Sequence, residues 1–253
     1  MEAIKSLKHK LENREVILST ALCNIGYSGL PRIYKKSGID FLVMDLEHGS
    51  FNPENIGDFL YICNNMGLPV IVRALGSEYH CISKPLDMGA DGILIPRTET
   101  IKQVETAISS MRFYPVGEKG VGGRGILRNG EEVNDFNKNR LLFLQIESTL
   151  GVNTLDEILT KYGNEVSGII IGPYDMAVSL GCGLNIEADE VMENIKRTIK
   201  TCRKHKMSIG IFMDDESNVK SWKNLGINIF WIGTELSLLC SALSNVHNAV
   251  LGL

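Results

Sequence analysis

The sequence lacks the features that would place this chain in a membrane. No apolar run approaches the roughly 20 residues that a helix needs to span a bilayer. The N-terminal segment alternates charged and apolar side chains, and it lacks the continuous apolar core of a signal peptide. We therefore expect a cytoplasmic protein with no membrane partner.

Cysteine pairs and excess positive charge are missing as well. The six cysteines are scattered and none forms a C-x-x-C pair, so we predict reduced, mostly buried thiols rather than a disulfide framework or a thiolate zinc site. The net charge is −4, and the densest basic stretch, residues 196–206, has the periodicity of a solvated helix face. These features argue against a nucleic-acid partner.

Short apolar runs alternate with longer amphipathic segments along the chain. Eight runs are rich in Ile, Val, Leu and Phe, and most have the weak polar–apolar alternation that is typical of strands buried on both faces of a parallel sheet. Each run is followed by a segment with helical periodicity. The predicted strands are residues 15–22, 40–48, 69–75, 92–97, 141–148, 168–173, 208–213 and 228–234.

Eight strand–helix units in 253 residues predict an α/β fold, and within that class a (β/α)8 TIM barrel. We expect a single domain, residues 1–253, that begins with an N-terminal helix. A doubly wound open sheet is the alternative. It more typically has fewer strands and a G-x-G-x-x-G motif after its first strand, and that motif is missing here. The glycine-rich segment 113–140 breaks the rhythm between the fourth and fifth strands, and we expect a long loop there.

Polar residues gather where the predicted strands end. In a (β/α)8 barrel the C-terminal ends of the strands form the active site, so side chains from at least five strands are expected to meet at one mouth. The residues concerned are Asp45, Glu47, His48, Arg73, Arg97, Gln145, Glu147 and Asp175.

Glu147 and Asp175 are hard oxygen ligands on neighbouring strands, with no cysteine or histidine beside them. Two carboxylates completed by waters and a substrate oxygen suit Mg2+ or Mn2+, with Co2+ as a further candidate, better than they suit structural zinc. The alternative is that each carboxylate caps a helix or pairs with an arginine.

His48 follows Asp45 closely, and a carboxylate beside an imidazole can orient the ring for general-base catalysis near neutral pH. Arg73 would place a permanent cation in the same mouth, where it could stabilise an enolate or bind an acid group. The alternatives are a structural histidine, and an ion pair between Arg73 and Asp45 or Glu47. The turn at residues 172–175 could bind a carboxylate through backbone N–H groups, because an opening helix has unpaired donors.

Seven stretches of the chain, in their order and spacing, resemble the metal-dependent pyruvate aldolases of the HpcH/HpaI family, such as the 4-hydroxy-2-oxoheptanedioate and 2-keto-3-deoxyrhamnonate aldolases. The similarity covers nearly the whole chain from about residue 15. The stretches are DFLVMDLEHGSF, PVIVRAL, LDMGADGILIPRTET, YPVGEKGVGG, LQIES, IIGPYDMAVSLG and GINIFWIGTELSLL. The resemblance implies a divalent cation, a 2-oxo acid substrate with a pyruvate half, and an aldehyde as the second partner.

The resemblance also assigns roles in proton transfer and charge stabilisation to matching positions. His48 corresponds to the catalytic base and Asp45 to its partner carboxylate. Asp87 corresponds to a second carboxylate that increases the basicity of the histidine. Arg73 corresponds to the residue that stabilises the enolate.

The metal ligands of the family correspond to Glu147 and Asp175. The positions assigned to substrate binding are Gln145, Gly172, Pro173, Tyr174 and Asp175, with Tyr174 acting through its backbone. The chain departs from the family at Tyr174, where a small residue is common, and after Arg73, where many members have Trp-Asn-Asp. These departures lie more on the aldehyde side of the pocket than on the metal side, and the aldehyde is left open.

The predicted activity is metal-dependent aldol cleavage or condensation of a 4-hydroxy-2-oxo acid, giving pyruvate and an aldehyde. A related lyase or an oxaloacetate decarboxylase with the same metal site is one alternative, and a non-catalytic metabolite-binding barrel is another. The C-terminal segment 234–253 is more apolar than the surface helix of a monomer requires. Together with the resemblance, it indicates a homo-oligomer, either a trimer or a hexamer built from trimers in which neighbours exchange the last helix.

Overall fold

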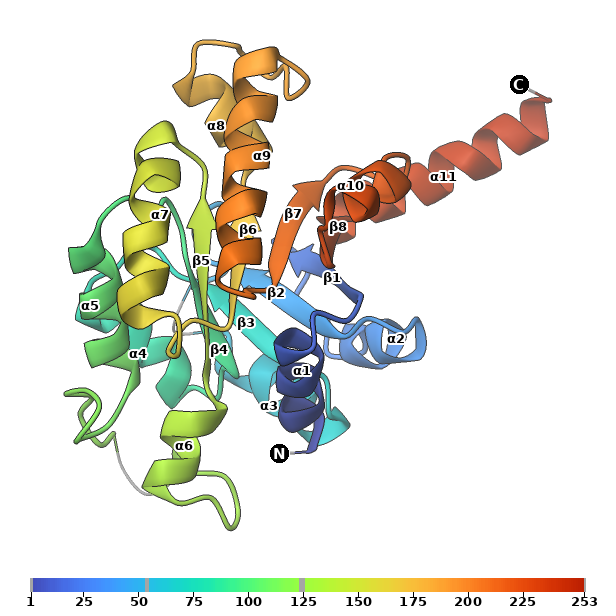
Figure 1. Cartoon of the computed structure of the whole chain (residues 1–253). Coiled ribbons are helices and arrows are strands. Elements are labelled where there is room, and N and C mark those ends of the chain that lie inside the picture. The colour runs from blue at the N-terminus through green and yellow to red at the C-terminus, as the bar shows by residue number, and fades with distance from the viewer. Residues whose placement is uncertain (1, 53–54, 123–125, 253) are drawn as a thin grey trace.

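Eight parallel strands close into one barrel in the computed structural model (Figure 1). The structure describes residues 2–52, 55–122 and 126–252. Consecutive strands pair with each other, and the last strand pairs with the first to complete the ring. The strands are β1 (Ile17–Leu22), β2 (Phe41–Asp45), β3 (Val70–Arg73), β4 (Gly92–Ile95), β5 (Leu141–Ile146), β6 (Gly168–Ile171), β7 (Ile209–Met213) and β8 (Ile229–Thr234). The predicted (β/α)8 TIM barrel is confirmed.

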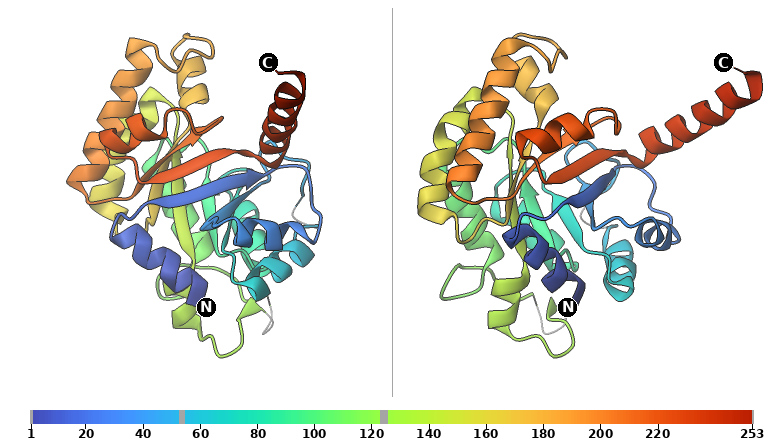
Figure 2. Two further views of the ribbon diagram at one scale, coloured as in Figure 1. Left: turned by 90° about the vertical axis from the view of Figure 1, so that its right-hand side faces the viewer. Right: turned by 45° about the vertical axis from the view of Figure 1, so that its right-hand side comes forward.

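Helices follow the strands and surround the barrel (Figures 1 and 2). They are α1 (Glu2–Glu12), α2 (Leu30–Lys36), α3 (Gly57–Met66), α4 (Tyr79–Asp87), α5 (Ile101–Met111), α6 (Val133–Asn139), α7 (Thr149–Tyr162), α8 (Pro173–Ser179), α9 (Asp189–Lys204), α10 (Val219–Leu225) and α11 (Glu235–Leu251). Two of the outer helices, α3 and α10, end at Gly67 and Gly226. The φ angles there are 64° and 98°, in the left-handed region that glycine adopts most readily.

The predicted N-terminal helix is α1, and it closes the end of the barrel at which the strands begin. Its buried Leu7 and Leu11 belong to the same apolar cluster as the side chains that fill the barrel interior. Phe41 and Phe143 stack within that cluster with ring centroids 5.7 Å apart. Apolar side chains fill this part of the barrel, and the polar residues lie at the opposite end.

The predicted loop between β4 and β5 is present, but its second half forms the helix α6. This helix buries Phe136, and Glu131 and Arg140 form a buried ion pair across its two ends with 2.7 Å between Arg140 Nη1 and Glu131 Oε1. This ion pair and the packing of Phe136 against Phe113, with ring centroids 4.8 Å apart, order a segment whose composition alone is typical of a loop. Residues 123–125 of the predicted loop lie outside the described residues.

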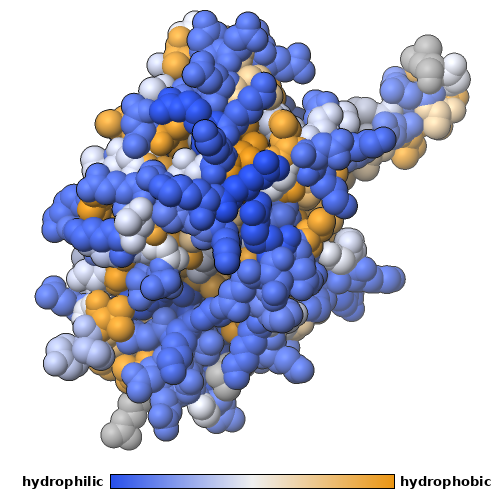
Figure 3. Space-filling view, in the orientation of Figure 1, coloured by the Kyte–Doolittle hydropathy of each residue, from blue (hydrophilic) through white to orange (hydrophobic). Residues whose placement is uncertain are grey.

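The last helix, α11, projects away from the barrel (Figures 1 and 2). Glu235 is the one described residue of α11 that is buried, and its carboxylate accepts hydrogen bonds from the backbone N–H groups of Cys23 and Ile25, each at 2.9 Å. Apolar surface is visible along the projecting arm (Figure 3). Within the described ranges, no helix combines the length and the hydropathy that crossing a bilayer requires.

Candidate active site

Most of the predicted site residues meet at the C-terminal ends of the strands. A cavity of about 250 Å3 opens there. It is lined by Ala21, Cys23, Asp45, His48, Arg73, Gln145, Gly172, Pro173, Tyr174, Asp175, Phe212, Trp231 and Thr234. Glu147 lies beside this lining, because its Oε2 accepts a hydrogen bond of 2.6 Å from Gln145 Nε2.

Arg73 lies between two carboxylates. Its Nε donates to Asp45 Oδ1 at 2.8 Å and its Nη2 to Asp45 Oδ2 at 2.6 Å, while its Nη1 lies 3.2 Å from Glu47 Oε2. The register of β2 and β3 makes Asp45 and Arg73 direct neighbours. Burial opposes the ionisation of Asp45, but the Arg73 guanidinium outweighs it and lowers the pKa of Asp45 below its ordinary value. The ion pair considered as the alternative for Arg73 is therefore present.

Removing the charge of Asp45 is expected to destabilise the fold. Asp45 is only 1% exposed, and a buried ion pair that loses one partner costs about 3–5 kcal/mol of unfolding free energy. Because the folded-state pKa of Asp45 is lowered, its contribution is present at neutral pH and is lost as the pH falls through that pKa. Chemical denaturation should therefore show Asp45→Asn to be much less stable than the wild type at pH 7, with a gap that narrows in acid.

The matched control for this change is Asp156→Asn on the surface of α7. The Asp156 carboxylate also pairs with a cation, Lys204, and it lies 2.8 Å from His205 Nε2, but 49% of its side chain is exposed to solvent, where such pairs contribute little. An Asp45→Asn protein that unfolds like the wild type at pH 7 would show that Asp45 does not stabilise the fold through Arg73.

Negative charge accumulates around Glu147 and Asp175. Glu147 is 4% exposed, and its Oε1 accepts a hydrogen bond of 2.7 Å from the backbone N–H of Arg97. Burial raises the pKa of Glu147 to about 7, and the charge of Asp175 adds to the shift. Burial also raises the pKa of Glu47, in spite of the opposing charge of Arg73. A cation placed among these carboxylates would relieve their repulsion.

The carboxylates fit a divalent cation that takes few protein ligands. Among the described residues there is no group of three or more His, Cys, Asp and Glu side chains that could hold a metal ion. Glu147 and Asp175 would therefore supply two oxygen ligands and leave the remaining positions to water and substrate, as suits Mg2+ or Mn2+. Gly172 keeps this place open, because a Cβ there would collide with Glu147 Oε2 and lie 2.9 Å from Gln145 Nε2.

His48 lies at the rim of the cavity with 65% of its side chain exposed. Its backbone N–H donates to Asp45 Oδ1 at 3.3 Å, and its Nε2 lies 3.8 Å from Glu47 Oε2. Asp45 therefore holds the backbone of His48, and Glu47 is the carboxylate nearer to the ring. Glu47 was predicted as a residue of the mouth and as a possible partner of Arg73, but not as the carboxylate beside the imidazole, because residues so close along a turn do not reveal which of them faces the ring.

Asp87 lies at the end of α4 and forms an ion pair with Lys119, whose side chain is fully buried. Gly122 packs against the same carboxylate, since a Cβ at that position would lie 3.1 Å from Asp87 Oδ2. Across the parts of the chain that the structure describes, no hydrogen bond or ion pair joins Asp87 to His48. The role of Asp87 in proton transfer stays a prediction.

Three aromatic side chains, Tyr174, Phe212 and Trp231, form one side of the cavity, which we call the aromatic wall. The ring centroids lie 6.2 Å apart for Tyr174 and Phe212, and 5.4 Å apart for Phe212 and Trp231. Burial, followed by a hydrogen bond that the Tyr174 hydroxyl donates to Asp214, raises the pKa of Tyr174 to about 12. Phe212 and Trp231 were missed, because aromatic residues within an apolar run are indistinguishable from core residues until the strand register is known.

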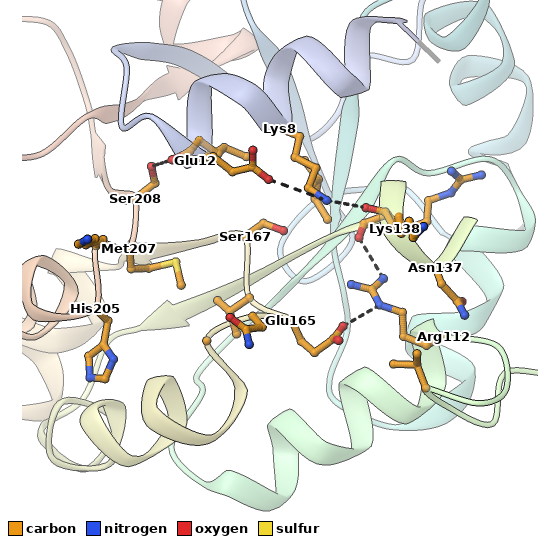
Figure 4. A pocket seen from close by; sticks show the side chains of 18 of the residues that line it. Lys8, Glu12, Arg112, Asn137, Lys138, Glu165, Ser167, His205, Met207 and Ser208 are labelled. Atoms are coloured by element: carbon orange, nitrogen blue, oxygen red, sulfur yellow. Dashed lines mark hydrogen bonds and ion pairs between the residues drawn. The ribbon is translucent and has the colours of Figure 1, made fainter. Parts of the chain in front are cut away.

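A larger cavity, of about 530 Å3, lies at the opposite end of the barrel (Figure 4). Its lining includes Ser167 and Ser208, which directly precede β6 and β7. Its buried Arg112 is already paired, with 3.1 Å between its Nε and Glu165 Oε2. Most of the predicted site residues line the smaller cavity, so we place the candidate active site there.

Known proteins of one family resemble this chain in sequence and in fold. A family model described as HpcH/HpaI aldolase/citrate lyase matches residues 29–242. The chain is 31% identical over 213 residues to the 5-keto-4-deoxy-D-glucarate aldolase of Escherichia coli O157:H7, covering 81% of each protein. It is 28% identical over 209 residues to the hydroxypyruvate/pyruvate aldolase of Roseovarius nubinhibens, covering 80% of each. The crystal structure of an HpcH/HpaI aldolase from Desulfitobacterium hafniense DCB-2 has the same fold, with a TM-score of 0.88 at 24% identity over 98% of this chain and 97% of that one.

Proposed function

The chain belongs to the HpcH/HpaI aldolase/citrate lyase family, and from this we propose that it cleaves a 4-hydroxy-2-oxo acid into pyruvate and an aldehyde and catalyses the reverse condensation. It is a carbon–carbon lyase. The observation that carries the proposal is that Asp175, a buried arginine and a histidine line one cavity, with the Glu147 carboxylate directly beside them. Enolate chemistry needs positive charge to stabilise the enolate and a base to move the proton, and these groups can supply both.

Glu147 and Asp175 would hold the divalent cation, with Mg2+ and Mn2+ as the candidates. When bound, that ion supplies positive charge for the carboxylate and keto oxygens of the substrate. Gln145 and the turn at residues 172–175 line the same part of the cavity and would position the pyruvate half. Arg73, which Asp45 and Glu47 hold in place, would face the negative charge that develops there.

His48 would serve as the base in the cleavage direction. It takes the proton of the 4-hydroxyl group, and the C3–C4 bond then breaks. The electron pair of that bond passes to the pyruvate half as an enolate, and C4 leaves as the aldehyde carbon. Protonation of the enolate at C3 gives pyruvate. The exposed position of His48 at the rim lets it exchange its proton with solvent between turnovers.

The test of this function is product analysis by NMR. The purified protein is incubated with Mg2+ and a panel of 4-hydroxy-2-oxo acids that differ in the aldehyde half. We expect pyruvate and one aldehyde in equal amounts from at least one of these acids. Release of CO2 from oxaloacetate, with no cleavage anywhere in the panel, would support the decarboxylase alternative instead.

We also propose that α11 packs against a neighbouring copy of the chain in a homo-oligomer, a trimer or a hexamer. The helix leaves its own barrel (Figure 2), and seven large apolar side chains on it are exposed. They are Leu236, Leu238, Leu239, Leu243, Val246, Val250 and Leu251. So many apolar side chains on one projecting helix would be costly in a monomer and suit an interface. The partner that covers this face is a second copy of the chain.

Charging this face is expected to break the assembly. Light scattering at micromolar concentration should give a multiple of 28.0 kDa for the wild type and a smaller mass for Leu243→Glu, because Leu243 is 61% exposed within one chain and would be buried between chains. The control is Tyr61→Glu on α3, which is 70% exposed and should leave the mass unchanged. A monomeric wild type would count against the proposal.

A further inference from the structure

Trp231 carries an unsatisfied polar atom inside the proposed active site. The residue lies on β8, is 2% exposed and lines the cavity. Its indole Nε1 has no hydrogen-bond partner within the described part of the chain. A buried indole N–H usually finds an acceptor, because leaving it unpaired costs free energy. Two acceptors would satisfy it: a buried water shared with the unpaired hydroxyl of Ser19, which lies opposite Trp231 in the register of β1 and β8, or an oxygen of a molecule bound in the cavity.

The surroundings of Trp231 hold its ring in place. Phe212 meets the indole edge to face, with planes at 86° and centroids 5.4 Å apart. The guanidinium carbon of Arg73 lies 5.4 Å from the centroid of the Trp231 ring, as in a cation–π contact. Trp231 thus sits next to the cation that is proposed to face the enolate.

A second residue of the lining also has an unsatisfied polar atom. Gln145 is 3% exposed, and its amide nitrogen donates to Glu147, while its Oε1 has no partner among the described residues. Two residues of the lining therefore each have one buried, unpaired polar atom: a donor on β8 and an acceptor on β5. A 4-hydroxy-2-oxo acid carries acceptor oxygens and a hydroxyl donor, so it can satisfy both.

We propose that Trp231 is a substrate-contacting residue, whose indole N–H donates a hydrogen bond to an oxygen of the bound 2-oxo acid. The inference rests on the proposed function and adds a residue to it. The contact places the rigid aromatic wall directly against the substrate, so this wall limits the size of the group that fits beside Arg73. A water molecule in place of the substrate oxygen is the competing explanation.

The two tryptophans of the chain allow a direct test. Trp222 lies on α10, is buried in the outer core and does not line the cavity. Trp222→Phe leaves Trp231 as the sole tryptophan, and Trp231→Phe leaves Trp222. Both variants are loaded with Mg2+ and titrated with pyruvate, while tryptophan fluorescence is recorded and affinity is measured separately by calorimetry.

We expect saturable fluorescence change in Trp222→Phe and none in Trp231→Phe. The dissociation constant for pyruvate should rise about 3- to 10-fold in Trp231→Phe, the loss expected for one hydrogen bond, and should stay at the wild-type value in Trp222→Phe. The fluorescence change is measured in Trp222→Phe, which keeps Trp231, so this result does not depend on how Trp231→Phe folds.

The outcomes separate this inference from the proposed function. If calorimetry shows pyruvate binding to the wild type, but Trp231 fluorescence does not respond and Trp231→Phe binds equally well, the contact is overturned and the aldolase proposal stands. If the Mg2+-loaded wild type does not bind pyruvate by either method, the proposed function fails, and the contact fails with it.

Discussion

Replacing Glu147 by Gln is expected to remove divalent-metal binding from the cavity and to lower pyruvate formation by about a thousandfold or more, since a catalytic cation contributes several kcal/mol of charge stabilisation. Glu147 is one of the two carboxylates that we propose as ligands of the ion. Glutamine keeps the size of the side chain and an oxygen for the Arg97 N–H but loses the charge. Mn2+ binding by calorimetry and turnover on the same preparation measure the two effects.

The control is Glu157→Gln, an exposed glutamate on α7 far from the cavity, which should bind Mn2+ normally. Thermal unfolding of both variants separates loss of the ligand from loss of the fold. Wild-type Mn2+ affinity in Glu147→Gln would show that the metal assignment is wrong.

Metal binding should also depend on pH near neutrality. Burial and the charge of Asp175 raise the pKa of Glu147 to about 7, so below that pH the carboxyl must release a proton before it can bind the ion. The Mn2+ affinity should therefore fall as the pH is lowered through 7, by about tenfold per pH unit well below the pKa. An affinity that stays constant between pH 5.5 and 8 would contradict this account.

Replacing His48 by Ala is the second change with a large expected effect. The loss of a general base lowers kcat by about 10²–10⁴-fold. Metal binding should survive, because Glu147 and Asp175 follow other strands of the barrel. The melting temperature should change little, because the His48 side chain is 65% exposed. Pyruvate production and thermal unfolding are measured on the same variant.

His80→Ala is the matched control, since His80 is an exposed histidine on α4 that does not line the cavity. A purely structural His48 predicts the opposite pattern: a lower melting temperature with unchanged turnover per folded molecule. That pattern would rule out the catalytic role.

The fold could be predicted from the sequence because the same strand–helix pattern occurs eight times along the chain. Eight apolar runs with little alternation, each followed by a helical period, fit few architectures other than a closed parallel barrel. The helix α6 was not predicted, because it is stabilised by the Glu131–Arg140 ion pair and by the burial of Phe136, which composition does not reveal.

The sequence indicated which residues lie in the mouth of the barrel more reliably than which of them contact one another. Strand-end positions placed Asp45, Arg73 and Gln145 in one mouth, and the structure brings them together. The pairing within the mouth depends on register and side-chain direction. These place Arg73, rather than the His48 ring, against the Asp45 carboxylate. Trp231 was missed because an aromatic residue in a buried strand is ordinarily part of the core.

The central claim is that this cavity forms the enolate of pyruvate with the help of a divalent cation. Exchange of the pyruvate methyl protons in D2O, followed by proton NMR, tests it without knowledge of the aldehyde. The account predicts that the wild type with Mg2+ exchanges these protons far faster than the protein-free control, and that a chelator or Glu147→Gln abolishes the exchange. Exchange no faster than the protein-free rate, in a protein shown to bind both Mg2+ and pyruvate, would contradict the account.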